Sequence, residues 1–407
     1  MQIRPILASL RKHRIPAILI VLEIALACAV LCNAVFMIGQ RVSDIRLPNA
    51  IDQAGLSSIE VQGTDPKQAG DDIPRNLAAL RAIAGVKAVT AMNALPLTNY
   101  TWNGGLSTHP DKDMLNKRIV GMQEYLYTAG GGKALGLKVL QGRFFNADES
   151  AGSKLDSFMP AGHVVLITQS LARKFWPHGS AVGKMLYLGD KFSYTVVGVV
   201  ADVLRPNRSG QGEQSFYYSA FFPLQPNDSA LSTYVVRSAP ADRDRVLREG
   251  IKALSTLAPN AVVKGRTFSD IRDKYFADMR SMAWMLVLVC AVMLAVTAFG
   301  IVGLTSFWVG QRRRQIGIRR AVGATRGQIL GYFRTENFLL STAGVLIGML
   351  LAFGINLYLM QHYEMSRMPW YYLPTGAVTL WLLGQLAVLG PALRAASVSP
   401  VEATRSA

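Results

Sequence analysis

Long apolar stretches lie near both ends of the chain. Residues 15–38 ("IPAILIVLEIALACAVLCNAVFMI") are apolar over roughly 24 positions, which at about 1.5 Å per residue is enough to cross a hydrocarbon core about 30 Å thick. This stretch is too long for a removed signal peptide and lacks the small-residue cleavage site. Further stretches follow near the C-terminus, at residues 282–308, 338–360 and 371–393. The pattern predicts four transmembrane helices, the first alone and the others together.

Residues 42–280 show a different pattern, in which strand-like and helix-like segments alternate. Strand patterns at 56–63 ("LSSIEVQG") and 86–97 ("VKAVTAMNALPL") flank helical spacing at 71–85 ("DDIPRNLAALRAIAG"). The same series recurs late in the region as "STYVVRSA", "PADRDRVLREGIKALSTLA" and "NAVVKGRTF". Two strand-helix-strand units are therefore expected.

The segment between these units is richer in glycine and short strands, and its clearest elements are "HVVLITQSLARKFWP" and "YTVVGVVADVL". We expect a base of about residues 52–105 and 216–270, with a mixed, β-rich lobe of about 106–215 inserted into it. The predicted fold class is an α-helical membrane domain of four transmembrane helices plus a large external α+β domain. The corresponding domain boundaries are 1–41, 42–280 and 281–407.

The junction before the second span, residues 268–286 ("FSDIRDKYFADMRSMAWML"), contains neither proline nor glycine. It predicts one continuous helix from the external domain into the membrane, which would act as a rigid lever. The alternative is a membrane helix that overruns the bilayer by only a turn or two.

The distribution of basic residues predicts the orientation of the spans, because basic loops are retained on the cytoplasmic side. Basic residues before the first span and in the tail are Arg4, Arg11, Lys12, Arg14, Arg394 and Arg405. Those of the loop 310–334 are Arg312, Arg313, Arg314, Arg319, Arg320, Arg326 and Arg334. The loop 361–370 has only Arg367. Both termini and the loop 310–334 are therefore expected in the cytoplasm, with residues 42–277 outside.

Composition narrows the class of partner. The chain has 43 Lys+Arg against 26 Asp+Glu, a formal net charge of +17, which suits nucleic acid or an anionic membrane surface. Because the basic residues flank the apolar spans, membrane lipid is favoured and no nucleic-acid partner is expected. The cysteines, Cys28, Cys32 and Cys290, all fall in apolar spans, so the external region must fold on its own core without a disulfide.

Motifs for catalysis are missing from the sequence. The string closest to a phosphate-binding loop, "GSAVGKM" at 179–185, is one residue short between its glycines and has Met185 where a hydroxyl should bind magnesium. We interpret it as a turn that leads into a strand. The histidines have no metal-ligand spacing, and Ser170 lacks the GxSxG context. The chain is therefore expected to be no enzyme and to bind no cofactor or metal.

Glu23 lies inside the first span, where an ionisable group is costly and usually faces a partner or water. A polar contact between helices is the favoured interpretation. A protonated glutamate, one that reaches toward the interface, and a place on a transport route are the alternatives.

The segment 310–330 ("GQRRRQIGIRRAVGATRGQIL") is patterned beyond its charge. Apolar residues recur at intervals close to one helix face, at Ile318, Val322, Ile329 and Phe333. Gly323 permits a break, and Thr325 with Gln328 predicts a capping box that starts a new helix. Such a segment could hold topology and touch anionic lipid, or it could be gripped by a cytoplasmic protein.

Several strings carry a resemblance to a known family. "RRRQIGIRRAVGATRGQILGYFRTENFLL", "GVLIGMLLA" and "PALRAASVSPVEATR" resemble the FtsX-type permease domain of MacB-like ABC transporters. Upstream, "YLYTAGGGKALGLKVLQGRFF", "VVLITQSLARKFWPHGSAVGK" and "YTVVGVVADV" resemble the periplasmic core domain of the same family. The resemblance covers nearly the whole chain in the right order.

The resemblance implies a permease of the type VII ABC superfamily in a bacterial inner membrane, with a periplasmic external domain. Its implied partners are a cytoplasmic ABC ATPase dimer, which is a separate subunit and binds the ATP, and a second permease chain in a homodimer or paralogous heterodimer. A periplasmic adaptor and an outer-membrane channel accompany some members. The implied mechanism is mechanotransmission, in which ATP hydrolysis moves the external domain to export a small molecule, a peptide or another periplasmic substrate.

The resemblance also implies an ATPase-coupling segment within residues 310–334. Its candidate residues are Arg312, Arg313, Arg314, Gln315, Ile316, Gly317, Ile318, Arg319, Arg320, Ala321, Val322, Gly323, Ala324, Thr325 and Arg326. Gln315 stands where the family usually has glutamate, which suggests one half of a heterodimer. The alternatives are a lipoprotein-releasing or cell-wall-hydrolase-regulating permease of the same superfamily, and a membrane ligand sensor without an ATPase.

Overall fold

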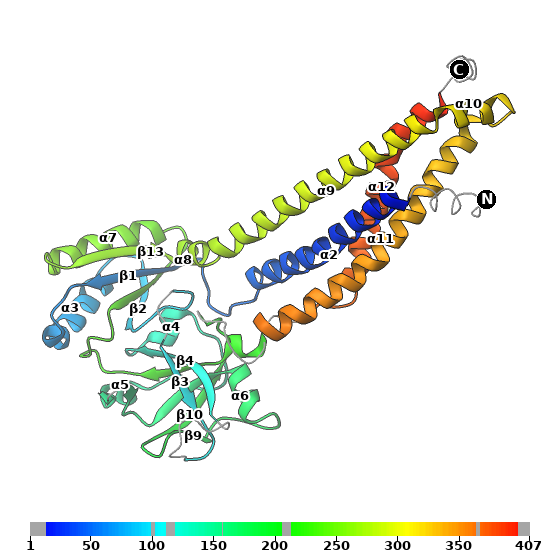
Figure 1. The fold of residues 1–407 in the computed structure, drawn as a ribbon. Coiled ribbons are helices and arrows are strands. Elements are labelled where there is room, and N and C mark those ends of the chain that lie inside the picture. Colours follow the sequence, from blue (N-terminus) through cyan, green and yellow to red (C-terminus); the bar gives the residue numbers. More distant parts are fainter. Residues whose placement is uncertain are drawn as a thin grey trace. The chain divides into compact units, whose positions relative to one another are not determined.

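The computed structural model describes residues 14–98, 102–110, 119–156, 158–205, 213–363 and 367–397. Two compact units make up the chain (Figure 1). The first, here called the membrane unit, comprises Met1–Arg46 and Met279–Ala407, and the second, the external unit, comprises Leu47–Asp278. The basic residues expected to orient the termini, Arg4, Arg11, Lys12 and Arg405, lie outside the described residues.

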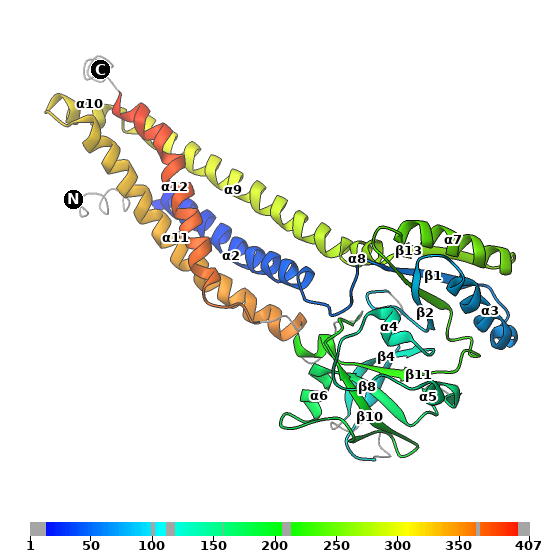
Figure 2. The same cartoon turned by 180° about the vertical axis from the view of Figure 1, so that it is seen from behind.

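Among the described residues, four helices are long and apolar enough to cross a membrane, which confirms the prediction of four such helices. They are α2 (Arg14–Ile45), α9 (Ala277–Gln311), α11 (Arg326–Tyr363) and α12 (Tyr372–Ala396). A short helix, α10 (Arg313–Ala321), lies at the end of the bundle where α9 ends and α11 begins (Figures 1 and 2).

Glycines on α11 and α12 allow these helices to pack closely on α2. A Cβ atom at Gly344 would lie 2.8 Å from the Cβ of Ile24, and one at Gly348 would lie 2.6 Å from the carbonyl oxygen of Ala25. Both distances are too short for a real side chain. The spacing of four between the two glycines therefore puts a smooth backbone surface against α2, as is common where helices associate in lipid.

The base of the external unit is built from the two predicted strand-helix-strand units, which the structure confirms. The first consists of β1 (Leu56–Gln62), α3 (Ala69–Arg81) and β2 (Val86–Met92). The second consists of β12 (Thr233–Ser238), α7 (Arg243–Leu257) and β13 (Val262–Thr267). Their strands form antiparallel pairs in the order β13-β1-β12-β2. In this split arrangement β1 of the first unit lies between the two strands of the second, and β12 of the second lies between the two strands of the first.

The inserted lobe continues the same sheet. Its elements are β3 (Asn103–Leu106), β4 (Val120–Tyr127), α4 (Gly131–Leu135), β5 (Val139–Gly142), α5 (Ala147–Ala151), β8 (Val164–Thr168), α6 (Gln169–Phe175), β9 (Met185–Leu188), β10 (Phe192–Val200) and β11 (Ser219–Pro223). A separate small ladder joins β6 (Leu155–Asp156) to β7 (Met159–Pro160). The main order runs β2-β4-β11-β8-β10-β5, and β2 of the base pairs with β4 of the lobe at Met92 and Tyr127.

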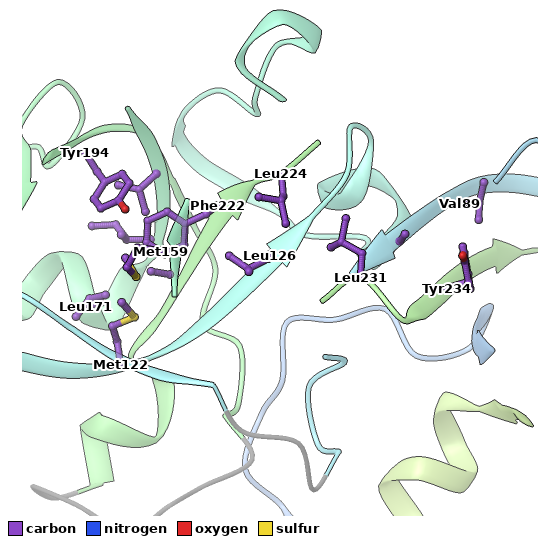
Figure 3. Packing of buried hydrophobic residues seen from close by; sticks show 14 of the residues in the cluster. Val89, Met122, Leu126, Met159, Leu171, Tyr194, Phe222, Leu224, Leu231 and Tyr234 are labelled. Carbon is purple, nitrogen blue, oxygen red and sulfur yellow. The ribbon is translucent and has the colours of Figure 1, made fainter. Parts of the chain in front are cut away.

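The strand β11 falls within the predicted second segment of the base, yet it pairs with β4 and β8 of the lobe. It supplies the apolar centre of the lobe, where Phe222 meets Tyr194 with ring centroids 4.8 Å apart. Figure 3 shows Met122, Met159 and Leu171 around this pair. Aromatic residues of this stretch therefore serve packing, with Phe221 and Phe222 both fully buried.

The predicted continuous helix across the junction is wrong in detail. Helix α8 (Phe268–Tyr275) ends one residue before α9 begins at Ala277, and Phe276 stands between them with φ −91° and ψ 0°. Its ring is 2% exposed and contacts that of Tyr275, with centroids 4.8 Å apart. Burial of this aromatic side chain fixes a break that the absence of proline and glycine did not indicate.

Candidate functional site

The candidate site is the connection between α9 and α11. Helix α10 follows α9 almost without interruption, because the amide of Arg312 donates to the carbonyl of Trp308 and the amide of Ile316 donates to the carbonyl of Arg312, at 3.0 and 2.9 Å. The chain then reverses at Gly323, whose φ is +102°. A residue with a side chain is strained in that region, so glycine is the residue that suits this turn.

The start of α11 is capped as the sequence predicted. The amide of Gln328 donates to Oγ1 of Thr325 at 3.3 Å, and the amide of Thr325 donates to Oε1 of Gln328 at 3.0 Å. These reciprocal bonds satisfy two backbone amides that the first helical turn leaves without partners. The capping box thus ends the turn and starts the third membrane helix at a defined residue.

A buried ion pair ties the start of α10 to α11. Nη1 of Arg312 lies 3.1 Å from Oε1 and 3.2 Å from Oε2 of Glu336, and the two side chains are 10% and 2% exposed. The guanidinium also lies over the ring of Trp308, 5.6 Å from its centroid. Because each charge would be costly to bury alone, the pair holds the end of α9 against α11.

Other arginines of the segment make different contacts. Nη1 of Arg320 donates to the carbonyl of Ala396 at 3.2 Å, which places a positive charge at the C-terminus of α12. The guanidinium of Arg319 lies over the ring of Tyr332, 5.2 Å from its centroid. Arg313 lines a cavity of about 410 Å³ together with residues of α9 and α12.

The predicted apolar face of this segment is wrong in part. Ile329 and Phe333 are buried, and Ile316 is buried with them. Ile318 and Val322, however, are 48% and 84% exposed. The chain reversal at Gly323 separates α10 from α11, so one helical periodicity does not run through both. Ile318 and Val322 instead give the connection an exposed apolar surface beside its arginines.

A pocket of about 250 Å³ opens between α10 and the start of α11. Its floor consists of buried residues of both helices, and its rim of exposed polar ones. It is lined by Arg312, Gln315, Ile316, Arg319, Ala324, Gln328, Ile329, Tyr332 and Phe333. The sequence placed these residues in one segment, but the pocket arises only from the turn that brings the two helices together.

Glu23 faces another membrane helix. A Cβ atom at Gly300 of α9 would lie 2.6 Å from Oε2 of Glu23, so the carboxyl group rests directly on the backbone of α9. This is a contact between α2 and α9 within the membrane unit, and glycine at position 300 makes room for it.

The external unit has a pocket of about 400 Å³ that sequence reasoning missed. Its wall includes the basic side chains Arg266 and Lys274, the acidic Glu60, and Leu97, whose φ of +67° is strained for a residue with a side chain. These residues come from separate strands, a loop and α8. No local motif could therefore have indicated the pocket.

Burial places an unusual acid inside the lobe. Glu124 of β4 is 1% exposed, its Oε2 has no hydrogen-bond partner, and burial raises the pKa of the carboxyl group to about 8.

The string "GSAVGKM" forms a turn before β9, with Gly179 and Gly183 at positive φ, as predicted. The described residues contain no group of three or more His, Cys, Asp or Glu that could hold a metal ion.

Comparison with known families covers most of the chain. Residues 18–254 match the family described as MacB-like periplasmic core domain, and residues 287–400 match FtsX-like permease C-terminal. The two matches lie in the same order along the chain as the two sets of strings noted in the sequence.

Curated relatives are similar over different lengths. The macrolide export ATP-binding/permease protein MacB of Chromobacterium violaceum is 27% identical over 279 residues, which cover 66% of this chain and 41% of that protein. The uncharacterized ABC transporter permease YknZ of Bacillus subtilis is 23% identical over 423 residues, covering 99% of this chain and 98% of its own length. The chain thus spans less than half of the first relative and nearly all of the second.

Solved structures of isolated domains are also similar. The extracellular domain of YknZ covers 52% of this chain and 99% of that structure, with a TM-score of 0.35 and 14% identity. The periplasmic region of MacB from Actinobacillus actinomycetemcomitans covers 58% of this chain and 97% of that structure, with a TM-score of 0.36 and 15% identity.

Proposed function

Because the chain belongs to the family of MacB-like ABC permeases with an FtsX-like C-terminal region, we propose that it couples ATP hydrolysis by a separate cytoplasmic ATPase to movement of its external unit. The chain is a membrane protein with an external domain. We place it in a bacterial inner membrane with both termini in the cytoplasm. Support comes from the arginines of the α9–α11 connection and from the single arginine in the loop 361–370.

The observation that carries the proposal is the construction of the α9–α11 connection. It leaves Ile318 and Val322 uncovered by the rest of the described chain beside arginines, which is the composition expected of a surface that a protein partner contacts. The buried pair of Arg312 with Glu336 fixes this surface to α9 and α11. A force applied to α10 would therefore reach two membrane helices rather than only bend a loop.

Mechanotransmission would then run along α9. Closure of the ATPase dimer moves α10, and α9 carries this displacement toward the external unit as a continuous helix from Gln311 to Ala277. The break at Phe276 makes that residue a joint between α9 and α8. The proposed lever is α9 alone, which is shorter than the sequence suggested.

The assembly would contain a second permease chain, either a copy or a paralogue that retains the acid replaced here by Gln315. The external pocket of about 400 Å³ has the size of a small-molecule site and mixes charged with apolar walls. It supports export of a small molecule or peptide, with an adaptor and an outer-membrane channel as further partners. Release of lipoproteins and regulation of a cell-wall hydrolase are the alternatives within the superfamily.

Recovery of the ATPase tests the proposal. The tagged chain is solubilised in mild detergent, and co-purified proteins are identified by mass spectrometry for the wild type, Val322→Glu and Val262→Glu. Both positions are exposed valines, at 84% and 53%, but Val262 lies in the external unit. We expect an ABC ATPase that only Val322→Glu loses. Absence of an ATPase under several detergents, or its equal loss in both variants, would contradict the proposal and favour a sensor without an ATPase.

A further inference from the structure

The pocket between α10 and α11 has an amphiphilic lining. Its buried floor includes Ile316, Ile329 and Phe333, which are 4–6% exposed, whereas Gln315 and Arg319 at its rim are exposed. Among the described residues that line it there is no carboxylate. A ligand that fits would therefore combine an apolar portion with a group that accepts hydrogen bonds.

A buried donor on the pocket wall lacks an acceptor. Arg312 uses Nη1 for both oxygens of Glu336, and its Nη2 is buried without a hydrogen-bond partner. The Arg312 side chain as a whole is nine-tenths buried. The indole Nε1 of Trp308, under the same guanidinium, also lacks an acceptor. Because a buried donor without an acceptor is unfavourable, a small movement of the Arg312 side chain that brought Nη2 to an acceptor in the pocket would be favourable.

The charge at the rim has the sign that an anion requires. Glu336 balances Arg312, which leaves the guanidinium of Arg319 as a further positive charge over the ring of Tyr332. The amide side chains of Gln315 and Gln328 add neutral hydrogen-bonding groups around it. Guanidinium groups recognise phosphate oxygens especially well, because their planar donors match the oxygens in pairs.

The position of the pocket indicates where a phosphate would come from. Arg312 directly follows α9, a helix long enough to cross the bilayer, so the pocket lies at the end of a membrane span. Tyr332, which lines it, and Trp308, which lies under the guanidinium of Arg312, are of the aromatic types enriched at membrane interfaces. We propose that this pocket binds the phosphate of an anionic phospholipid headgroup, with the glycerol and the first acyl carbons against Ile316, Ile329 and Phe333.

The bound lipid would form part of the α9–α11 connection. It would give Arg312 and Arg319 a shared acceptor and so hold α10 against the start of α11. This inference rests on the proposed function for its cytoplasmic location. It predicts that the geometry of the connection responds to the lipid composition of the inner leaflet.

Native mass spectrometry of the full chain, purified in a neutral detergent and depleted of lipid, tests the proposal. The probes are phosphatidylglycerol, phosphatidylcholine and inorganic phosphate. We expect one preferred phosphatidylglycerol per chain, and about fivefold weaker binding in Arg319→Gln, because one basic group near a phosphate contributes on the order of 1 kcal/mol. Arg314→Gln, an exposed arginine of the same helix outside the pocket, is the matched control and should keep the wild-type affinity.

A second variant guards against a change in folding. Gln328→Glu keeps an acceptor for the amide of Thr325, so the capping box persists while a negative charge enters the pocket. It should weaken phosphatidylglycerol binding and leave thermal stability unchanged. Equal binding of phosphatidylcholine, equal losses in Arg314→Gln and Arg319→Gln, or displacement of the lipid by millimolar inorganic phosphate would overturn the assignment.

The alternative occupant of this pocket is an acidic segment of a protein partner, which the experiment must distinguish from a lipid. Absence of lipid binding, together with protection of Arg319 from guanidinium-reactive reagents by an added ATPase, would assign the pocket to that partner and overturn the lipid proposal. Because lipid binding is measured without any ATPase, its failure leaves the proposed function standing. Conversely, loss of ATPase recovery leaves the lipid result unaffected.

Discussion

Glu124 is a buried acid in the lobe of the external unit, and its environment makes stability depend on pH. Burial raises its pKa from 4.5 to about 8, so the folded chain holds this proton where the unfolded chain has lost it. The stabilisation is present below about pH 4.5 and is lost as pH rises through about 8. Glu124→Gln should therefore be more stable than the wild type by roughly 5 kcal/mol at pH 9, with little difference at pH 4.

Thermal unfolding of the detergent-solubilised wild type, Glu124→Gln and Asp190→Asn at pH 4 and pH 9 checks this. Asp190 is an exposed acid of the same lobe, and its variant should follow the wild type. Parallel pH profiles for Glu124→Gln and the wild type would show that folding does not raise the pKa of this carboxyl group, and would contradict the prediction.

The pair of Arg312 and Glu336 predicts a characteristic pattern of single and double variants. Glu336→Leu leaves the guanidinium of Arg312 buried without a counter-charge and should destabilise the chain by about 3–5 kcal/mol. Arg312→Leu combined with Glu336→Leu removes both charges and should recover much of that loss. The unfolding midpoints of the single and double variants in detergent provide the comparison, and a double variant less stable than Glu336→Leu would contradict it.

At the scale of elements, the packing of α11 on α2 depends on glycine. Gly348→Leu should separate the two helices, because even a Cβ atom there would meet the carbonyl oxygen of Ala25 at 2.6 Å. Gly354→Leu, on the same helix, is the control, since a Cβ atom at Gly354 meets nothing within 4 Å. We expect a lower unfolding midpoint and less folded chain in the membrane only for Gly348→Leu. Comparable losses in both variants would argue against close packing at this position.

Elements with a strong local pattern could be predicted from the sequence. The membrane helices follow from the length of their apolar runs, and the two strand-helix-strand units from a change of hydrophobic period. The position of β11 in the sheet could not be predicted. A strand buried on both faces is apolar throughout, so its sequence does not indicate which strands it pairs with. The break at Phe276 likewise depends on burial of one ring, which periodicity does not report.

The candidate site was only partly predictable for the same reason. Thr325 and Gln328 are three residues apart, so their capping box is a local feature that the sequence reveals. The partner of Arg312 is Glu336, which is 24 positions away on another helix. Exposure of Val322 depends on how the chain reverses at Gly323. The capping box could thus be predicted from neighbouring residues, whereas the pocket and the ion pair depend on how the helices are arranged.

At the scale of the whole molecule, the proposed orientation places α10 and the lobe on opposite sides of the membrane. The native cysteines are all buried, so single introduced cysteines can report sidedness. Val322→Cys should react with a membrane-impermeant maleimide only after the inner membrane is opened, whereas Phe158→Cys, 73% exposed in the lobe, should react once the periplasm is reached. Labelling of both positions from the same side would refute the orientation.

Coupling across the whole molecule should depend on the turn at Gly323. A side chain there meets no neighbour within 4 Å, but φ of +102° disfavours β-branched residues most strongly. Gly323→Val should therefore displace α10 and reduce the ATP hydrolysed in response to the permease, while the chain still inserts. Gly323→Asn, which tolerates positive φ far better, should retain more of the coupling. The measurement is ATPase stimulation by each variant in proteoliposomes. Equal stimulation by Gly323→Val and the wild type would mean that force does not pass through this turn, and that α10 contributes to topology and lipid contact alone.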